Sequence, residues 1–553
     1  MPGIVKIPWR WQHARMSLLR FLILLVAALS SSAQALDKWF YYPTNLLPDE
    51  NIPKLEAVWK RAAAAGYTKV LLTDSKFAHL EEMGGPNFPK YFPHIEQVKK
   101  IAAELKLEIV PALFSVGYSN DLLGLDPNLI EAIPVKAVPL VVQGGVAHVE
   151  DAAAPTLPAY FSKPKEWSWK DDKFVAEGGV LRVVEAGGAV VRVVKKIAVQ
   201  PWRQYHVSVK IKTADFHGQP EIKVLVEGGA DLQWNFLGTK PTQDWTVHHA
   251  VFNSREFTEC SIYFGVWGAG KGTLELSEPK LEEVAFLNMT RRPGTPLTVT
   301  TADGKPLAEG RDFEPLTDLL LGAKPWRGEF DTFHQPPVLK TKLPDGTRLL
   351  ASYSHGATVY DHQATICMSE PKTYALLRDQ AQRMHKAWGA KAYMMSHDEI
   401  RVMNWCAACT ARHLTPGQML ADNVKRCAAI LREVNPGGRI YTWNDMFDPH
   451  HNAVKGPYYL VNGPLTGAWD GLDRDINIMQ WNFDKRAESL KFFADRGAKQ
   501  VIAGYYDSDP AHVAEWLAAA KAVPGSVTGV MYTTWQNNYG DLEKFSQAID
   551  AAK

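Results

Sequence analysis

The sequence predicts a (β/α)8 TIM barrel that is interrupted after its third strand by an inserted antiparallel β-sandwich of jelly-roll-like pattern. Two observations predict this fold. Apolar strands alternate with amphipathic helices in two separate parts of the chain, which is typical of a parallel sheet covered by helices. Between these parts the helical periodicity disappears, and short alternating runs bounded by Gly, Asp and Pro replace it, as in sandwiches.

The composition is that of a globular protein, with 46% hydrophobic and 22% charged residues among 553. Lys and Arg number 61 against 60 Asp and Glu, so the formal charge is only +1. No basic excess indicates a nucleic acid or an anionic membrane as partner. The 18 tryptophans supply flat apolar rings that suit both cores and the apolar faces of sugars.

The N-terminus has the pattern of an export signal. Arg15 and Arg20 precede the apolar run FLILLVAAL (21–29), and an Ala-x-Ala cleavage site ends at Ala35. The run is too short to span a bilayer comfortably, and no later segment is long and apolar enough to do so. We therefore expect residues 1–35 to be a signal peptide, no membrane span, and a mature protein exported to the periplasm or the exterior.

The barrel elements follow one another in order. The predicted strands begin at residues 38, 69, 107, 393, 439, 477, 500 and 529. Helices are predicted between them, at 51–65, 94–106, 373–388 and 416–433 among others. The last of these has Thr415 as its N-cap and Pro416 at its first position, both favoured there. Eight such units make a closed (β/α)8 barrel.

The inserted sandwich is expected at 156–286. Its runs PWRQYHVSVKIKT (201–213) and TLELSEPKLEEV (273–284) resemble the jelly-roll carbohydrate-binding modules attached to many glycosidases. A purely structural spacer is the alternative. The expected division is a signal peptide (1–35), the first part of the barrel (36–155), the sandwich (156–286), an irregular β-rich connection (287–372) and the rest of the barrel (373–553).

In such barrels the chemistry lies at the C-terminal ends of the strands. Three of the eight predicted strands end in Trp, and four carry a carboxylate there. Trp rings with a few carboxylates fit a sugar pocket, because rings stack on sugar faces while carboxylates bind hydroxyls or move protons. The candidates at or near these ends are Asp74, His397, Asp398, Glu399, Trp443, Asp445, Trp481, Tyr505, Asp507, Trp535 and Asn537.

These strand ends resemble the family 20 glycoside hydrolases, the β-N-acetylhexosaminidases, over roughly 38–117 and 373–550. The motifs that carry the resemblance are LLTD (71–74), MSHDEI (395–400), YTWNDMF (441–447), NIMQWN (477–482), Tyr505-Tyr506-Asp507 and Trp535, in the family's order. The resemblance implies an exported exo-glycosidase that acts on an oligosaccharide or polysaccharide with retention and needs no cofactor or metal.

The resemblance also implies roles. Glu399 would be the general acid, its pKa raised by its neighbour's charge and by partial burial, and Asp398 would stay ionised and orient the 2-acetamido group of the substrate, whose carbonyl oxygen attacks the anomeric carbon. Tyr505 would donate to that oxygen. The remaining expected substrate contacts are Asp74, His397, Trp443, Asp445, Trp481, Asp507, Trp535 and Asn537.

The sequence departs from the family pattern in three places. The first predicted strand is followed by no Arg to hold the terminal sugar, Asn537 stands where a Glu is common, and Ser396 and His397 replace glycines before the acid pair. These changes affect recognition of the terminal sugar more than the acid pair. A divergent relative with a different substrate is therefore expected.

Three alternatives stay open. One is a glycosidase for a sugar without an acetamido group, such as a galactoside, with Asp445 or Asp507 as nucleophile or base. Another is a glycan-binding protein without activity. The third is a metal-dependent hydrolase whose ligands would be His397, Asp398, His450 and His451.

Five cysteines are present: Cys260, Cys367, Cys406, Cys409 and Cys427. Export permits disulfides, and the odd number leaves at least one cysteine unpaired within the chain. Cys406-Ala-Ala-Cys409 has metal-ligand spacing, but no second such pair occurs. A disulfide among the last four is therefore preferred over a zinc site.

Overall fold

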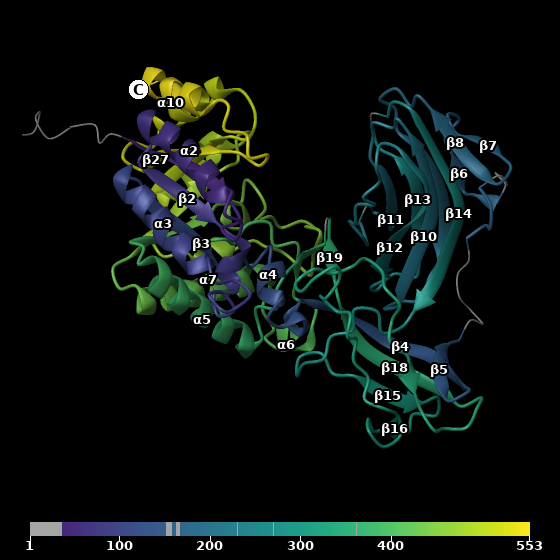
Figure 1. Cartoon of the computed structure of the whole chain (residues 1–553). Coiled ribbons are helices and arrows are strands. Elements are labelled where there is room, and N and C mark those ends of the chain that lie inside the picture. The colour runs from purple at the N-terminus through teal and green to yellow at the C-terminus, as the bar shows by residue number, and fades with distance from the viewer. Residues whose placement is uncertain are drawn as a thin grey trace, which may run out of the picture.

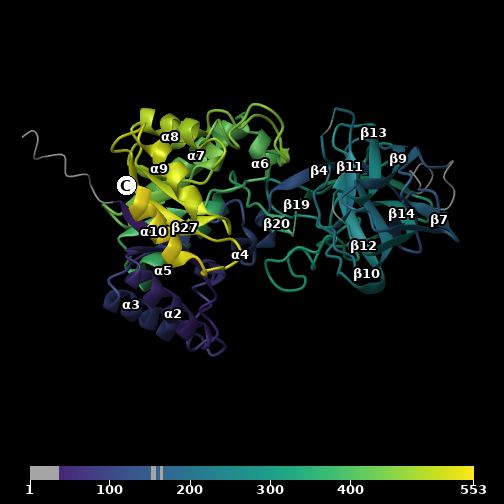
Figure 2. The same cartoon turned by 90° about the horizontal axis from the view of Figure 1, so that it is seen from above.

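The computed structural model describes residues 36–150, 157–161, 166–228, 230–268, 270–360 and 362–552. The expected signal peptide, residues 1–35, lies outside the described residues. Figures 1 and 2 show a barrel wrapped by helices with a β-sandwich beside it, and Figure 1 shows a smaller sheet at the base of the sandwich.

Eight parallel strands close into a barrel in the order of the chain, as the sequence predicts. Pairing of β1 with β27 completes the circle, with Trp39 beside Met531. The strands are β1 (Asp37–Pro43), β2 (Lys69–Thr73), β3 (Glu108–Leu113), β21 (Ala392–Met395), β23 (Arg439–Trp443), β25 (Ile476–Gln480), β26 (Gln500–Tyr505) and β27 (Val527–Thr533).

Helices cover the outside of the barrel (Figure 1). They are α2 (Asn51–Ala64), α3 (Tyr91–Glu104), α5 (Pro371–Trp388), α7 (Pro416–Val434), α8 (Arg486–Asp495), α9 (Val513–Ala520) and α10 (Leu542–Ala552). The predicted start of α7 is confirmed. The Thr415 side chain accepts from the Gln418 backbone N–H, and the Gln418 side chain accepts from the Thr415 backbone N–H, which together form a capping box.

Alternation along the strands divides the apolar residues into two cores. One set, which includes Trp39, Met394 and Trp443, fills the barrel interior. The other, which includes Phe40, Tyr393 and Tyr532, packs between the strands and the helices. Side chains of successive strand residues point to opposite faces, so the inner set leads up the barrel to its open C-terminal end.

The insertion after β3 contains the predicted sandwich. One sheet has the order β12-β10-β14-β8-β7 and the other the order β11-β13-β9-β6, around a continuous apolar core. The strands are β6 (Trp169–Lys170), β7 (Val175–Glu177), β8 (Val180–Val184), β9 (Val191–Ala198), β10 (Gln204–Ala214), β11 (Pro220–Leu225), β12 (Gln243–Asn253), β13 (Glu259–Val266) and β14 (Thr273–Val284).

The boundaries around the sandwich need correction. We expected 36–155 to belong to the barrel and 287–372 to be an irregular β-rich connection. The second range does contain strands, but both ranges contribute strands to one sheet of the order β16-β15-β18-β4-β5-β17. Its longest pairing joins β4 to β18, far apart in the sequence, and local patterns do not reveal such partners. The strands are β4 (Ala132–Gln143), β5 (Val146–Val149), β15 (Thr298–Thr301), β16 (Pro306–Leu307), β17 (Leu339–Lys340) and β18 (Arg348–Gly356).

A narrow neck joins the insertion to the barrel. The outgoing chain passes through α4 (Asn120–Leu123) and η2 (Pro127–Leu129), and the returning chain through β19 (Thr358–Val359) and β20 (Gln363–Ala364). The two run side by side: Glu131 N–H donates to Thr365 O at 2.7 Å, and Cys367 N–H to Leu129 O at 2.7 Å. Among the described residues, no helix has the length and apolarity needed to cross a membrane.

Candidate active site

A cavity of about 610 Å³ opens at the C-terminal ends of the barrel strands. Its wall combines aromatic rings with carboxyl groups, as in a sugar pocket. The rings belong to Tyr41, Phe77, Tyr118, Trp443, Trp481 and Trp535, and the carboxyl groups to Asp74, Asp121, Asp398 and Glu399. The opening therefore lies where the sequence placed the chemistry.

The acid pair stands at the end of β21, held against the loop after β3. Ser396 N–H donates to Leu113 O at 2.8 Å, and Val116 N–H donates to Ser396 O at 3.1 Å. The two loops touch so closely that a Cβ at Gly117 would lie 1.9 Å from the Asp398 carbonyl oxygen. Only glycine fits there.

Glu399 has charge-stabilising partners on both carboxyl oxygens. Arg401 Nη2 lies 2.5 Å from Oε1, and the Tyr118 hydroxyl donates to Oε2. Arg401 is itself held by Gln363 and lies over the Tyr360 ring, 4.8 Å from its centroid. The ion pair and the hydroxyl together fix the position of the Glu399 carboxyl group.

Burial raises the pKa values of Asp398 and Asp445. Burial, and then the charge of Glu399, raise the pKa of Asp398 to about 7. Burial, and then the charge of Asp398, raise the pKa of Asp445 to about 8. Asp445 Oδ2 accepts from the Glu399 N–H at 2.8 Å, and its Oδ1 accepts from the Trp481 indole at 3.3 Å. Near neutral pH these groups hold protons that ordinary aspartates have lost.

The three predicted tryptophans form the far wall of the cavity. Trp535 makes edge contacts with Trp443 at 6.2 Å and with Trp481 at 6.3 Å between ring centroids. Tyr41 extends this wall from β1, 5.7 Å from Trp535. Burial raises the pKa of Tyr41 to about 12, so its hydroxyl is a neutral donor.

Asp74 borders the cavity, but its oxygens are already used. They accept from the backbone N–H groups of Leu46 at 2.9 Å and Lys76 at 3.0 Å, and from the Tyr91 hydroxyl at 3.0 Å. Burial raises its pKa. Asp74 therefore holds the loops after β1 and β2 in place. We expected it to contact the substrate instead.

The structure turns two predicted substrate contacts away from the cavity. His397 is fully buried, with Nε2 2.9 Å from Asn423 Oδ1, and burial lowers its pKa to about 4. Tyr505 packs on Tyr532 in the outer core and donates to Asp541 at 3.1 Å. Its φ of 82° breaks the strand alternation that would have pointed it inward.

The next residues of that loop serve Trp535. The Tyr506 ring lies parallel to the Trp535 ring, with 6.0 Å between centroids. Asp507 accepts from the Trp535 backbone N–H at 2.7 Å and from the Thr534 hydroxyl at 2.5 Å, so it positions the tryptophan and does not border the cavity. Asn537 is exposed and also lies outside the cavity wall.

Several cavity residues were not singled out from the sequence. Tyr118 follows β3 in the segment GYSN, where a glycine just before an aromatic residue was the available signal. Burial raises the pKa of Asp121, in the next turn, to about 7. Gln363 comes from the returning neck and bonds the backbone oxygens of Gly117 at 2.8 Å and Glu399 at 2.9 Å. No local pattern points to it.

A second cavity of about 480 Å³ adjoins the first and shares Tyr118 and Asp121 with it. Arg401 and Tyr360 line its barrel side. Phe236, from the loop between β11 and β12 of the sandwich, stacks on Tyr360 with 5.0 Å between centroids. The sandwich thus contributes directly to the edge of the site.

The expected metal-hydrolase ligands do not converge. Within the described parts of the chain, the groups of His, Cys, Asp and Glu close enough to hold an ion include neither His397 nor Asp398, and neither His450 nor His451. His451 instead packs on Trp481 at 4.5 Å, and burial lowers its pKa.

The expected disulfide is also absent among these residues: all five cysteines are buried free thiols. Three of them nevertheless lie together, because Cys367 Sγ is 3.6 Å from Cys406 Sγ and 3.5 Å from Cys409 Sγ. These distances exceed the length of an S–S bond, about 2.05 Å.

Comparisons with known proteins give structural neighbours only. No family profile and no curated protein matches the sequence. The tandem family 20 catalytic modules of the pneumococcal exo-β-D-N-acetylglucosaminidase StrH are 9% identical, with 94% of this chain and 84% of theirs covered and a TM-score of 0.35. A rhamnosidase from Novosphingobium sp. PP1Y is 11% identical over 95% of this chain, which spans only 59% of that enzyme, with a TM-score of 0.34.

A family 16 carbohydrate-binding module is 18% identical, with 23% of this chain and 96% of its own covered and a TM-score of 0.19. The neighbours thus include both groups that the sequence motifs resemble, the family 20 enzymes and the carbohydrate-binding modules. With TM-scores this low they carry no inference about activity, which depends on the site itself.

Proposed function

We propose that this chain is an exported glycoside hydrolase that removes a terminal β-linked 2-acetamido sugar from a glycan, with retention and with the acetamido group as nucleophile. The observation that carries the proposal is the Asp398–Glu399 pair in a cavity walled by three tryptophans at the C-terminal end of the barrel. The export part rests on the signal-like pattern of residues 1–35 alone.

In this proposal Glu399 acts as the general acid. It stands where the two cavities meet, since its partner Tyr118 lines both of them and Arg401 lines the second. A sugar in the first cavity and its leaving group in the second would present the glycosidic oxygen at this junction. Glu399 must then leave Arg401 and take up a proton, which the glycosidic oxygen receives as the bond breaks.

Asp398 lies deeper, and its ionised form would orient the acetamido N–H and stabilise the positive charge that develops next to it. Burial, and then the charge of Glu399, raise its pKa, so the ionised form that this role needs becomes more populated as pH rises. Tyr41 takes the role expected of Tyr505, because its neutral hydroxyl borders the cavity while Tyr505 points away.

The second cavity would bind the leaving group. Its aromatic rings, Tyr360 and Phe236, and its polar groups, Gln363 and Arg401, suit a sugar better than a simple alcohol. We therefore expect a glycan of at least two sugars as the natural substrate, with the sandwich completing the binding site.

The test is hydrolysis of aryl 2-acetamido-2-deoxy-β-glycosides, gluco and galacto, beside their 2-hydroxy counterparts. Turnover of the acetamido substrates only, with loss in Glu399→Gln, would support the proposal. Turnover of the 2-hydroxy substrates would leave Glu399 as the acid but would require a carboxyl group as the nucleophile, and Asp445 would be the first candidate. Binding on a glycan array with no turnover of any substrate would overturn the enzyme in favour of a glycan-binding protein.

A further inference from the structure

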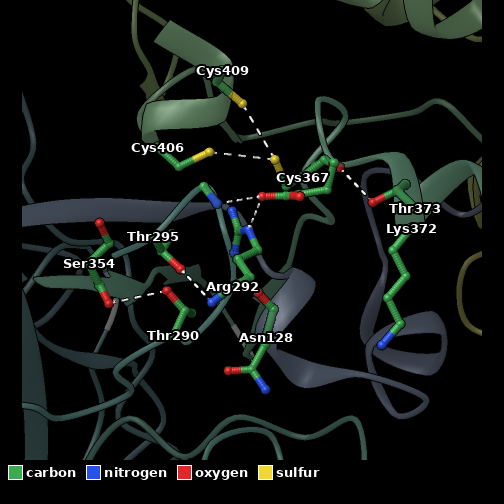
Figure 3. Close-up of polar contacts among 12 residues, drawn as sticks. Asn128, Thr290, Arg292, Thr295, Ser354, Cys367, Lys372, Thr373, Cys406 and Cys409 are labelled. Atoms are coloured by element: carbon green, nitrogen blue, oxygen red, sulfur yellow. Dashed lines mark hydrogen bonds and ion pairs between the residues drawn. The ribbon is translucent and has the colours of Figure 1, made fainter. Parts of the chain in front are cut away.

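A cluster of four buried ligand groups lies outside the cavity, in the neck. It consists of the thiols of Cys367, Cys406 and Cys409 and the carboxyl group of Glu131, and we call it the thiol–carboxylate cluster. The three thiols are 0% exposed and Glu131 is 2% exposed, and the four ligand atoms all lie within 4.8 Å of one another. In Figure 3, the sulfur atoms of Cys406 and Cys409 point from a short helix toward that of Cys367.

We infer that the thiol–carboxylate cluster binds a single zinc ion, which fastens the neck of the insertion to the active-site loop after β21. Tetrahedral zinc with bonds of about 2.3 Å to sulfur places two such sulfurs about 3.8 Å apart. Cys367 Sγ is 3.6 Å from Cys406 Sγ and 3.5 Å from Cys409 Sγ. The spacing is too long for a disulfide and close to that of shared metal ligands.

The carboxyl group of Glu131 is prepared as the fourth ligand. Its Oε1 accepts from the backbone N–H groups of Trp405 at 2.8 Å and Cys406 at 3.1 Å. Its Oε2 remains 3.4 Å from Cys409 Sγ. Backbone hydrogen bonds thus fix one oxygen and leave the other facing the thiols, the arrangement that orients a carboxylate ligand.

The surroundings supply a compensating charge. Arg292 is 4% exposed at its side chain, its Nε pairs with Glu370 at 3.0 Å, and its Nη1 donates to Ile130 O at 2.8 Å. Figure 3 shows its guanidinium just below the three thiols. Three thiolates and a carboxylate would be prohibitive to bury alone; a divalent cation offsets two of these charges, and Arg292, although paired with Glu370, adds a positive charge beside them.

The ligands come from three segments that zinc would join. Glu131 belongs to the outgoing neck, Cys367 to the returning neck, and Cys406 and Cys409 to the loop that carries Glu399 and Arg401. The ion would therefore be structural: all four positions are protein groups, so no site is left open for water or substrate.

The first test measures metal and thiols in the full-length protein purified without chelators. We expect about one zinc per chain by elemental mass spectrometry. Replacement by Co²⁺ should give the charge-transfer absorption of thiolate ligands. Reduced cysteines without stoichiometric zinc, or cysteines of the cluster joined in a disulfide, would overturn the inference.

Variants locate the ion. Cys409→Ser should lose the zinc, while Cys427→Ser should retain it, since Cys427 is equally buried but contacts Asn423 at 3.8 Å and lies outside the cluster. Zinc retained in Cys409→Ser would contradict the assignment. If Cys409→Ser does not fold, thiol titration of the wild-type protein decides: zinc release must accompany reaction of cluster thiols, and release without it would contradict the assignment.

Discussion

Two groups of ionisable side chains each include residues of the loop after β21, and they differ in almost every other respect. In the active-site group, Asp398 and Glu399 border a cavity of about 610 Å³, and the fully buried Asp445 accepts from the Glu399 N–H, so three carboxyl groups lie close together. The thiol–carboxylate cluster is closed on all sides. An open group can exchange protons with solvent and substrate, whereas a closed one needs a resident cation. The first part of the loop after β21, with Asp398 and Glu399, therefore serves the chemistry, and its later part, with Cys406 and Cys409, serves the stability of the fold.

Substitution of Glu399 should have the largest effect, because it should change activity without changing stability. Glu399→Gln removes the proton donor, so we expect kcat on acetamido glycosides to fall about 10²- to 10⁴-fold, with the midpoint of thermal unfolding nearly unchanged. Steady-state kinetics and calorimetry check both. Glu96→Gln, an exposed change on α3, should keep full activity. Full activity in Glu399→Gln would refute the assignment of the acid.

Zinc removal should mainly lower the stability of the fold. Because the ion binds only the folded protein, its loss should lower the free energy of unfolding by about 3 to 4 kcal/mol at free zinc 100 to 1,000 times the Kd. Urea unfolding with and without a chelator measures this. The Cys427→Ser protein should respond like the wild type. If a chelator had no effect on stability, the thiol–carboxylate cluster would not hold a stabilising ion.

Asp445→Asn tests whether the open group is strained by its charges. The pKa of Asp445 rises from an ordinary 3.8 to about 8, so between these values the folded state holds a proton that the unfolded state has lost. Stability therefore falls as pH rises through this window. Asparagine cannot ionise, so the melting temperature of the variant, compared with that of the wild type, should improve from pH 5 to pH 8.

The control for this experiment is Asp507→Asn. Its carboxylate accepts from the Trp535 backbone N–H and the Thr534 hydroxyl, so its replacement should bring no stabilisation at either pH. An equal gain at both pH values in Asp445→Asn would mean that ionisation of Asp445 is not the cause.

The smallest effect is expected at the edge of the second cavity. Phe236→Ala removes a ring that stacks on Tyr360, and such contacts contribute about 0.5–1.5 kcal/mol. The KM for a disaccharide should rise about 2- to 10-fold, and the KM for an aryl glycoside should change less. Tyr263→Ala, which removes a sandwich ring outside the cavity, should leave both unchanged. Equal changes for both substrates would argue against a sugar in this cavity.

The sequence predicted what repeats locally. The eight strands, the N-cap of α7 and the three cavity tryptophans all follow from alternation, capping residues and strand ends. The prediction failed where a single backbone angle, or a contact with a residue far away in the sequence, determines where a side chain lies. Tyr505 turns outward through a positive φ, and Gln363 reaches the acid pair from the far side of the insertion. The approach of Cys367 to Cys406 was expected as part of a disulfide, and the structure has it as a contact between free thiols.

The outgoing and returning segments of the neck lie side by side, which has a consequence for the history and the engineering of this chain. Ser119 N–H donates to Ala364 O at 2.8 Å, so the insertion leaves and re-enters the barrel at nearly the same point. A gene segment added there lengthens a surface connection without separating β3 from β21. The barrel could thus acquire a whole accessory module in one step, and an engineer could exchange that module at this junction while keeping the order of the barrel strands.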